Sequence, residues 1–241
     1  MRTLFVSDLH LIETRPQANE AFFSFLEREA RGADALYILG DLFEYWIGDD
    51  DLSDPFNAVV AGLLKDLSAR GVPVFVMHGN RDFLIGPGFC RAAGATLLDD
   101  PAVVTAGGEP VLLMHGDTLC TDDLDYQAWR RTARSAEWQR SFLGKSLAER
   151  RREILALRDK SREVIQAKPA DIMDVNAAAV AQALGHHGVR RLVHGHTHRP
   201  GRHALRVGGR ACERWVLPDW YGPGGYLAIA GGRARLTRFP K

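Results

Sequence analysis

The sequence predicts an α/β protein built around a largely parallel β-sheet. Three short apolar runs in the first third of the chain each end in a polar loop. Segments with apolar residues at helical spacing separate these runs, and they stop at Gly32 and Gly71, as helices commonly do. Strands that alternate with helices in this way form βαβ units, in which consecutive strands run parallel.

The elements of the first third can be placed from this pattern. Strands are expected at residues 4–7, 35–39 and 73–77, each as a buried run that ends in a loop. Helices are expected between them at residues 17–31 and 56–70, where the apolar side chains recur near a period of 3.6.

The rest of the chain has a different pattern, because glycine-rich turns there join short alternating segments. The later elements follow in order: a hairpin of residues 103–105 and 111–114, a helical stretch over 126–168, a helix at 174–186, a strand at 191–193 and antiparallel strands over 203–239.

Composition limits the function before any motif is considered. The chain has 241 residues with a formal net charge of +1, so it can bury a full core but has no overall field for a nucleic acid. Its three cysteines are widely spaced and form neither a disulfide framework nor a CxxC zinc site, which suits a reducing compartment. The N-terminal apolar stretch is too short for a secretory signal, so we expect a cytoplasmic protein that binds no nucleic acid.

The near-zero charge hides an uneven distribution. Residues 126–168 hold twelve Lys and Arg and five Asp and Glu, a local net of +7, which leaves −6 for the remainder. Such a run is most often a solvated helical face. Aromatic and aliphatic residues interleave with the charges here, however, and Trp129, Trp138 and Phe142 could belong either to the core or to a ligand pocket.

Side chains of the types that bind metals recur at equivalent positions, in the loops that follow predicted strands. They are Asp8, His10, Asp41, Asn80, His115, His196 and His198. The carboxyl ends of strands in α/β sheets are where ligands bind, so these side chains are expected to meet. Seven ligands are too many for one tetrahedral site and fit two metals that share a carboxylate. Oxygen and imidazole donors without thiolate suit Mn²⁺, Fe²⁺, Ni²⁺ or Zn²⁺.

Each of these signals taken alone is also compatible with an ordinary turn or cap. Gly40-Asp41 is common turn chemistry, and Asp82 could be either a turn cap or a partner of a metal ligand. His78 and His194 could orient ligands or simply pack in loops. The combination in this order, each member after a strand, favours the metal site.

The motifs in this order resemble those of the calcineurin-like metallophosphoesterase superfamily. They are Asp8-x-His10, Gly40-Asp41, Gly79-Asn80-Arg81-Asp82, His115-Gly116 and Gly195-His196-Thr197-His198. The resemblance implies a sandwich of two packed β-sheets flanked by helices. The longer strings at residues 39–50, 115–123, 172–176 and 194–200 are similar to one family of that superfamily, the UDP-2,3-diacylglucosamine hydrolases of lipid A biosynthesis in Gram-negative bacteria. This resemblance covers nearly the whole chain and implies a single domain, 1–241, with a helical insertion cap at 122–170.

The resemblance also implies the roles of individual residues. It implies two Mn²⁺ ions, one held by Asp8, His10, Asp41 and His198 and the other by Asp41, Asn80, His115 and His196. Asp41 would bridge them, and the catalytic residues would be Asp41, Asn80, Arg81, His115 and His196. Substrate contacts would fall on Asn80, Arg81, Asp123, Tyr126, Ser161, Ile165, Lys168 and His196, with Ile165 standing where some relatives carry a polar side chain.

Arg81 occupies a position where many superfamily members have a histidine that protonates an alkoxide leaving group. An arginine cannot give up its proton, which fits a diphosphate substrate, whose leaving group is a phosphate. We therefore expect metal-hydroxide attack on the α-phosphorus of UDP-2,3-diacylglucosamine, giving UMP and 2,3-diacylglucosamine 1-phosphate. The alternatives are a phosphoesterase or nucleotide pyrophosphatase for a soluble substrate and a scaffold that has lost catalysis.

An amphiphilic substrate implies that the enzyme works at a membrane surface. We expect a monomer without an obligate protein partner, peripheral on the cytoplasmic face of the inner membrane. The inner surface of the basic stretch at 126–168 would hold two acyl chains. Its outer arginines, Arg150, Arg151 and Arg152, would contact anionic lipid headgroups.

Overall fold

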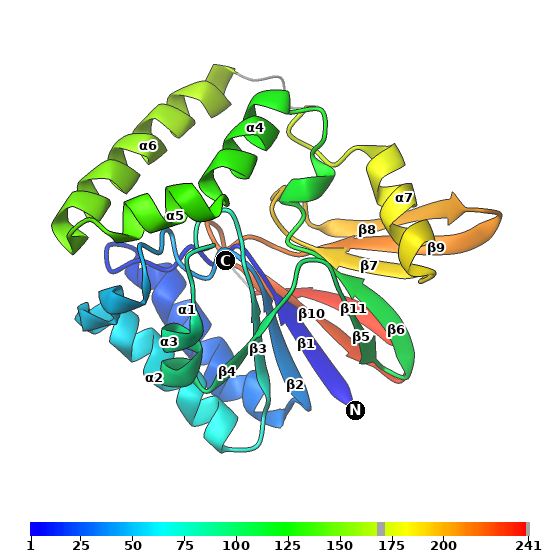
Figure 1. Cartoon of the computed structure of the whole chain (residues 1–241). Coiled ribbons are helices and arrows are strands. Elements are labelled where there is room, and N and C mark those ends of the chain that lie inside the picture. The colour runs from blue at the N-terminus through cyan, green and yellow to red at the C-terminus, as the bar shows by residue number, and fades with distance from the viewer. Residues whose placement is uncertain (168–171, 240–241) are drawn as a thin grey trace.

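Two β-sheets pack face to face in the computed structural model, which describes residues 1–167 and 172–239 and no side chain of residue 160 or residues 162–167. The first sheet has the strand order β11-β10-β1-β2-β3-β4, and the second has the order β5-β6-β7-β9-β8 (Figure 1). The strands are β1 (Arg2–Val6), β2 (Ala35–Leu39), β3 (Val74–Met77), β4 (Ala95–Leu98), β5 (Ala102–Ala106), β6 (Glu109–Leu113), β7 (Arg191–His194), β8 (Gly201–Val207), β9 (Arg210–Val216), β10 (Gly225–Ala230) and β11 (Arg233–Arg238).

Helices cover the outer face of each sheet. The helices are α1 (Pro16–Arg28), α2 (Pro55–Ala69), α3 (Pro87–Ala93), α4 (Leu124–Ala133), α5 (Ala136–Leu143), α6 (Leu147–Ala167) and α7 (Ala177–His187). On β1, Leu4 and Val6 point toward α1 to α3, whereas Phe5 points between the sheets. Helix α7 packs on the second sheet through Val180 and Leu184. The predicted sandwich flanked by helices is therefore confirmed.

The predicted parallel strands and the hairpin are also confirmed, with ends that shift by one or two residues. β1 pairs with β2, β2 with β3 and β3 with β4, all in parallel, while β5 and β6 are antiparallel. The pattern missed α3 and β4, which have seven and four residues. Segments this short show too little periodicity, and Gly94 separates them in a left-handed conformation that glycine tolerates best.

The helical stretch predicted at 126–168 consists of the three helices α4, α5 and α6. They lie together across the end of the sheets at which the loops after β1, β2 and β3 emerge (Figure 1). Ile165 lies in α6 without a described side chain, and Lys168 lies outside the described residues. Among the described helices, none is long and apolar enough to cross a membrane.

Arginines of α6 anchor this layer to the core, which corrects one expectation. Arg150 is only 3% exposed and donates to Asp50 Oδ1 at 2.8 Å. Arg151 donates to Asp51 Oδ1 at 2.8 Å. The expectation that Arg150 faces lipid headgroups is wrong, because it is buried against the acidic loop that follows β2, and the same loop also holds the half-exposed Arg151. Arg152 alone of the three is exposed. Part of the charge asymmetry between the helices and the remainder is thus complementary charge across their contact.

A candidate dinuclear metal centre

Five residues of the predicted metal set stand in an unusual backbone conformation. Their φ angles are 52° at Asp8, 50° at His10, 53° at Asp41, 67° at His196 and 52° at His198. Within the described part of the chain no other residue except glycine has a positive φ. Such conformations cost roughly 1–3 kcal/mol each and persist where a functional site requires them. The strain therefore concentrates at the strand ends that the sequence pattern marks.

Asp8, His10 and His198 form the first group of side chains. His10 Nε2 lies 3.4 Å from His198 Nε2, and His198 Nε2 lies 3.6 Å from Asp8 Oδ1. Ser7 Oγ and the backbone N–H of His196 donate to the Asp8 carboxylate at 2.6 Å and 2.9 Å. Two imidazole nitrogens and a carboxylate thus converge on one point, as ligands of a shared cation do.

Asn80, His115 and His196 form the second group. Asn80 Oδ1 lies 3.0 Å from His115 Nε2 and 2.8 Å from His196 Nδ1. His115 Nδ1 lies 2.9 Å from the carbonyl oxygen of Leu39, which accepts its proton, so Nε2 is the nitrogen that faces Asn80. This group offers two imidazole nitrogens and one amide oxygen.

Asp41 lies between the two groups. Its Oδ2 is 3.8 Å from His10 Nε2, and its Oδ1 is 3.9 Å from His115 Nε2. The backbone N–H of Arg81 donates to Asp41 Oδ1 at 2.8 Å and fixes the carboxylate. Since each oxygen faces a different group, this carboxylate has the geometry of a bridge.

Close backbone approach shapes both ends of the centre. A Cβ at Gly79 would lie 2.1 Å from Asp41 Oδ1, and a Cβ at Gly195 would lie 2.2 Å from Asp8 Oδ2. Asp82 accepts hydrogen bonds from the N–H groups of Gly79, Leu42 and Asp41 at 2.8, 2.7 and 3.2 Å. Asp82 therefore holds the loops that carry the predicted ligands, as one of its two sequence interpretations proposed.

Burial sets the protonation of the imidazoles. Loss of solvent lowers the pKa of His10 to about 4 and that of His196 to about 4, so both rings are neutral at pH 7 and can donate a lone pair. Burial would also lower the pKa of His115, but the charges of Asp41 and Asp117 outweigh it and raise that pKa to about 9. The neutral rings of His10 and His196 leave the negative charges of the buried carboxylates without full compensation. A buried set of oxygen and nitrogen donors with this uncompensated negative charge fits divalent cations.

His78 and His194, which lie beside the motifs, contact loop atoms and do not belong to either group of candidate ligands. His78 Nε2 lies 2.7 Å from the carbonyl oxygen of Ile85. His194 is fully buried, with Nδ1 2.8 Å from the carbonyl oxygen of Gly195 and Nε2 3.2 Å from Arg214 Nη1. Their described contacts fit loop packing.

The predicted substrate residues line a cavity of about 870 Å³ above the metal-binding groups, which we call the polar cavity. Those with described side chains are Asn80, Arg81, Asp123, Tyr126, Ser161 and His196. Asp123 also caps α4 by accepting from the N–H of Tyr126 at 3.1 Å. The structure thus brings together six of the eight predicted substrate residues, while the side chains of Ile165 and Lys168 are outside the description.

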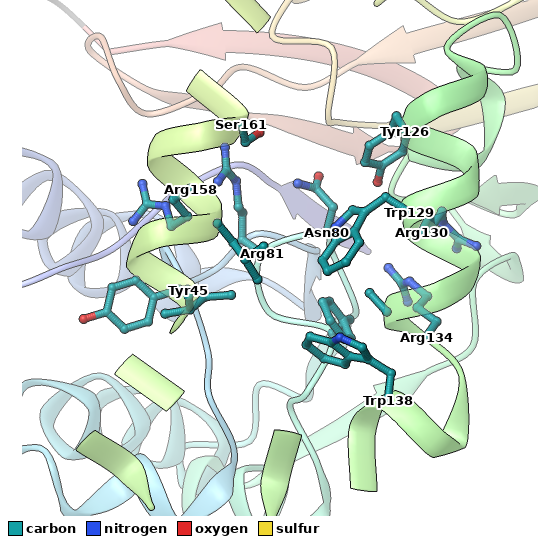
Figure 2. A pocket seen from close by; sticks show the side chains of 14 residues that line it. Tyr45, Asn80, Arg81, Tyr126, Trp129, Arg130, Arg134, Trp138, Arg158 and Ser161 are labelled. Carbon is teal, nitrogen blue, oxygen red and sulfur yellow. The ribbon is translucent and has the colours of Figure 1, made fainter. Parts of the chain in front are cut away.

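A second, smaller space of about 100 Å³ opens from the polar cavity between α4, α5 and α6, and we call it the cap pocket. Figure 2 shows Trp129 and Trp138 on one side and Tyr45 and the helix of Ser161 on the other. Phe83, Ile154 and Leu157 complete its apolar wall. Phe142, in contrast, is buried in the core. Of the three aromatic residues considered from the sequence, Trp129 and Trp138 line a pocket and Phe142 belongs to the core.

Sequence reasoning missed Asp117, which fixes α4 over the centre. This fully buried carboxylate accepts from Tyr126 Oη at 2.9 Å and from Arg130 Nε at 2.7 Å, and Arg134 Nη2 lies 3.6 Å away. Burial would raise its pKa, but the positive charges around it, His115 first, hold it well below the usual range. The adjacency of Asp117 to His115-Gly116 was the only sequence signal for it.

The chain is similar in sequence to known proteins over nearly its whole length. Residues 1–200 match the family model described as calcineurin-like phosphoesterase. A protein of Aromatoleum aromaticum named UDP-2,3-diacylglucosamine hydrolase is 52% identical over 96% of this chain and 94% of its own length. A protein of the same name from Azotobacter vinelandii is 49% identical over 100% of this chain and 99% of its own. Among solved structures, an archaeal phosphodiesterase aligns with 99% of this chain and 100% of its own, with a TM-score of 0.48 and 11% identity.

Proposed function

Because the chain belongs to the calcineurin-like phosphoesterases, and among them to the UDP-2,3-diacylglucosamine hydrolase family, we propose that it hydrolyses the pyrophosphate bond of UDP-2,3-diacylglucosamine in lipid A biosynthesis. The observation that carries the proposal is the arrangement of the site. Two groups of candidate metal ligands lie on either side of Asp41. The polar cavity is lined by five of these residues, His10, Asp41, Asn80, His196 and His198, and it shares lining residues with the cap pocket. Polar and apolar space side by side suits a nucleotide joined to a lipid.

We assign two divalent cations to the centre. Asp8, His10, Asp41 and His198 would hold the first, and Asp41, Asn80, His115 and His196 would hold the second. The distances within each group, the missing Cβ atoms at Gly79 and Gly195 and the neutral imidazoles support this assignment. Two bound cations supply an acidified water and neutralise phosphate oxygens. We propose Mn²⁺ for both, from the family resemblance.

The residues of this chain orient the diphosphate and stabilise the departing group. Asn80 and His196 lie in the second group and also line the polar cavity, so a phosphate bound there is within their reach. Arg81 lines both cavities, and its guanidinium offers five N–H donors and no acceptor. We propose that attack falls on the α-phosphorus, that UMP forms, and that the Arg81 guanidinium pairs with the departing sugar phosphate.

The acyl chains would enter the cap pocket. Its aromatic and aliphatic residues would contact an acyl chain. Ser161 and Tyr126 line both spaces and Asp123 lines the polar cavity beside them, where the sugar would sit. A volume of about 100 Å³ is below the roughly 300–1,000 Å³ of a pocket that encloses a ligand. We therefore propose that side chains of the cap pocket move apart when both chains bind.

The acyl chains are expected to contribute strongly to turnover. Each buried methylene adds about 0.8 kcal/mol, so kcat/KM for UMP release from UDP-2,3-diacylglucosamine should exceed that for UDP-glucosamine by at least about 100-fold. The assay follows UMP with Mn²⁺ present and after chelation. Equal turnover of both substrates would favour a pyrophosphatase for soluble nucleotides. Bound metal without UMP release would favour the catalytically inactive scaffold.

The outer side of α5 and α6 is the surface that we propose faces the inner membrane on its cytoplasmic side. Arg140 and Arg152 are exposed there, and so are Leu143 and Leu155. Apolar side chains among exposed arginines suit a peripheral contact with anionic lipid.

Charge reversal on this surface should weaken vesicle binding. Since each basic residue near an anionic bilayer contributes about 1 kcal/mol, the double variant Arg140→Glu/Arg152→Glu should partition on the order of tenfold less onto vesicles with anionic lipid at low salt. Flotation of the purified protein measures this. The control is Arg233→Glu, an exposed position on β11, which should float like the wild type. Undiminished flotation of the double variant would exclude this surface.

A further inference from the structure

Glu44 joins three separate parts of the molecule at one buried point. It follows β2 and is only 5% exposed. Its Oε2 accepts from Tyr221 Oη at 2.9 Å and lies 3.1 Å from His10 Nδ1. Its Oε1 forms an ion pair with Arg158 of helix α6. The loop after β1, the loop before β10 and the helix over the cavity therefore meet on this carboxylate.

This contact differs in kind from the other ion pairs that anchor α6. Asp50 is largely exposed, and its partner Arg150 touches none of the predicted metal ligands in the described contacts. Glu44 and Arg158 are both buried, at 5% and 6% exposure, so each charge depends on the other for compensation. A displacement of Arg158 would leave the Glu44 carboxylate undercompensated in a low-dielectric environment.

The other oxygen of Glu44 bears on the orientation of His10. The His10 ring presents Nε2 to Asp41 and His198 and Nδ1 to Glu44. His10 Nδ1 makes no hydrogen bond among the described contacts, so the Glu44 carboxylate 3.1 Å away is the acceptor nearest to it. This carboxylate favours the tautomer with the proton on Nδ1, which leaves the opposite nitrogen for a metal. The Tyr221 ring, stacked on His10 with a centroid distance of 4.8 Å, restricts the same ring from its face.

We propose that Glu44 is a positioning residue that orients His10 for metal binding and couples this orientation to the seating of helix α6. The inference rests on the proposed metal centre. Helix α6 carries Leu157 and Ser161, which line the polar cavity, so a ligand that shifts α6 acts on Arg158, Glu44 and His10 in turn. Because coupling between two sites is reciprocal, metal binding also favours the seated position of α6.

The test measures metal affinity without turnover. The whole protein, freed of metal, is titrated with Mn²⁺ against a chromophoric chelator, and melting temperatures are recorded for each variant. Glu44→Gln preserves shape but removes the charge, and it should weaken Mn²⁺ binding roughly 10- to 100-fold. In assays of Glu44→Gln with saturating Mn²⁺, KM for the substrate should return closer to its wild-type value than kcat does. Asp50→Asn is the matched control, because it removes the partner of another α6 arginine, and its Mn²⁺ affinity should stay within about twofold of wild type.

A second variant tests the coupling through α6. Arg158→Met keeps an unbranched apolar stem but removes the guanidinium. Arg158 touches none of the predicted ligands among the described contacts, and the variant should weaken Mn²⁺ binding severalfold. Wild-type affinity in Glu44→Gln would overturn the role of Glu44, and equal affinities of Arg158→Met and Asp50→Asn would overturn the coupling. If Glu44→Gln does not fold, the Arg158→Met comparison decides alone. Failure of the wild-type protein to bind two Mn²⁺ would instead contradict the proposed centre.

Discussion

Asp41→Ala is expected to lower kcat/KM for UDP-2,3-diacylglucosamine at least about 10³-fold, because it removes the side chain that we propose as the bridge between both metal positions. The two Asp41 oxygens lie 3.8 Å from His10 Nε2 and 3.9 Å from His115 Nε2. Without that carboxylate, the two sites lose a shared negative charge and the element that sets their separation. Elemental analysis after gel filtration should show fewer than two Mn²⁺ per chain.

The loss in Asp41→Ala should come from the site and not from unfolding. Burial raises the pKa of Asp82 to about 6, and the nearby charge of Asp41 adds to that effect. Removal of Asp41 relieves this repulsion and also removes the attraction that raises the pKa of His115, so the two effects oppose each other. The melting temperature of the metal-free variant should therefore stay close to that of the metal-free wild type. Asp66→Ala, at an exposed position on α2, is the control for loss of a carboxylate. Two retained Mn²⁺ and more than a tenth of the activity would rule out the bridge.

The sequence predicted that the candidate ligands lie close together, because their positions after strands are local information. A polar residue directly after a buried strand lies at the strand's carboxyl end, and parallel strands bring those ends to one edge. Asp8, Asp41 and Asn80 follow β1, β2 and β3, which are parallel neighbours. The positive φ angles at five of these positions were not visible in the pattern, because none of the five is glycine.

The long-range ion pairs could not be predicted in the same way. The basic run predicted lipid contacts for Arg150 and Arg151, yet their partners Asp50 and Asp51 lie 100 residues earlier. Net charge records how many groups a segment carries and not where they point. Glu44 escaped notice for the same reason, since its three partners come from distant segments. Short elements such as α3 and β4 were missed because four to seven residues carry little periodic signal.

Arg81 is the second position where a large effect is expected, and the chemistry of the leaving group gives the reason. The second ionisation of a phosphate monoester has a pKa of about 6, so the departing group needs charge neutralisation more than a proton. Arg81 lines both cavities, and its backbone N–H already holds Asp41, which places the side chain at the edge of the centre. A guanidinium there can contact two phosphate oxygens at once.

Arg81→Met should therefore lower kcat roughly 10²- to 10³-fold, the range seen when one group that stabilises transition-state charge is removed. Arg81→Lys should recover part of this loss, since it restores the charge but not the paired contact. The bound Mn²⁺ should remain at two per chain, because the backbone N–H on Asp41 is unchanged. Arg91→Met, at an exposed position on α3, should behave as wild type. A contrary result would be a kcat of Arg81→Met within threefold of the wild-type value together with a raised KM. Arg81 would then bind the substrate equally in the ground and transition states, and other groups would stabilise the departing phosphate.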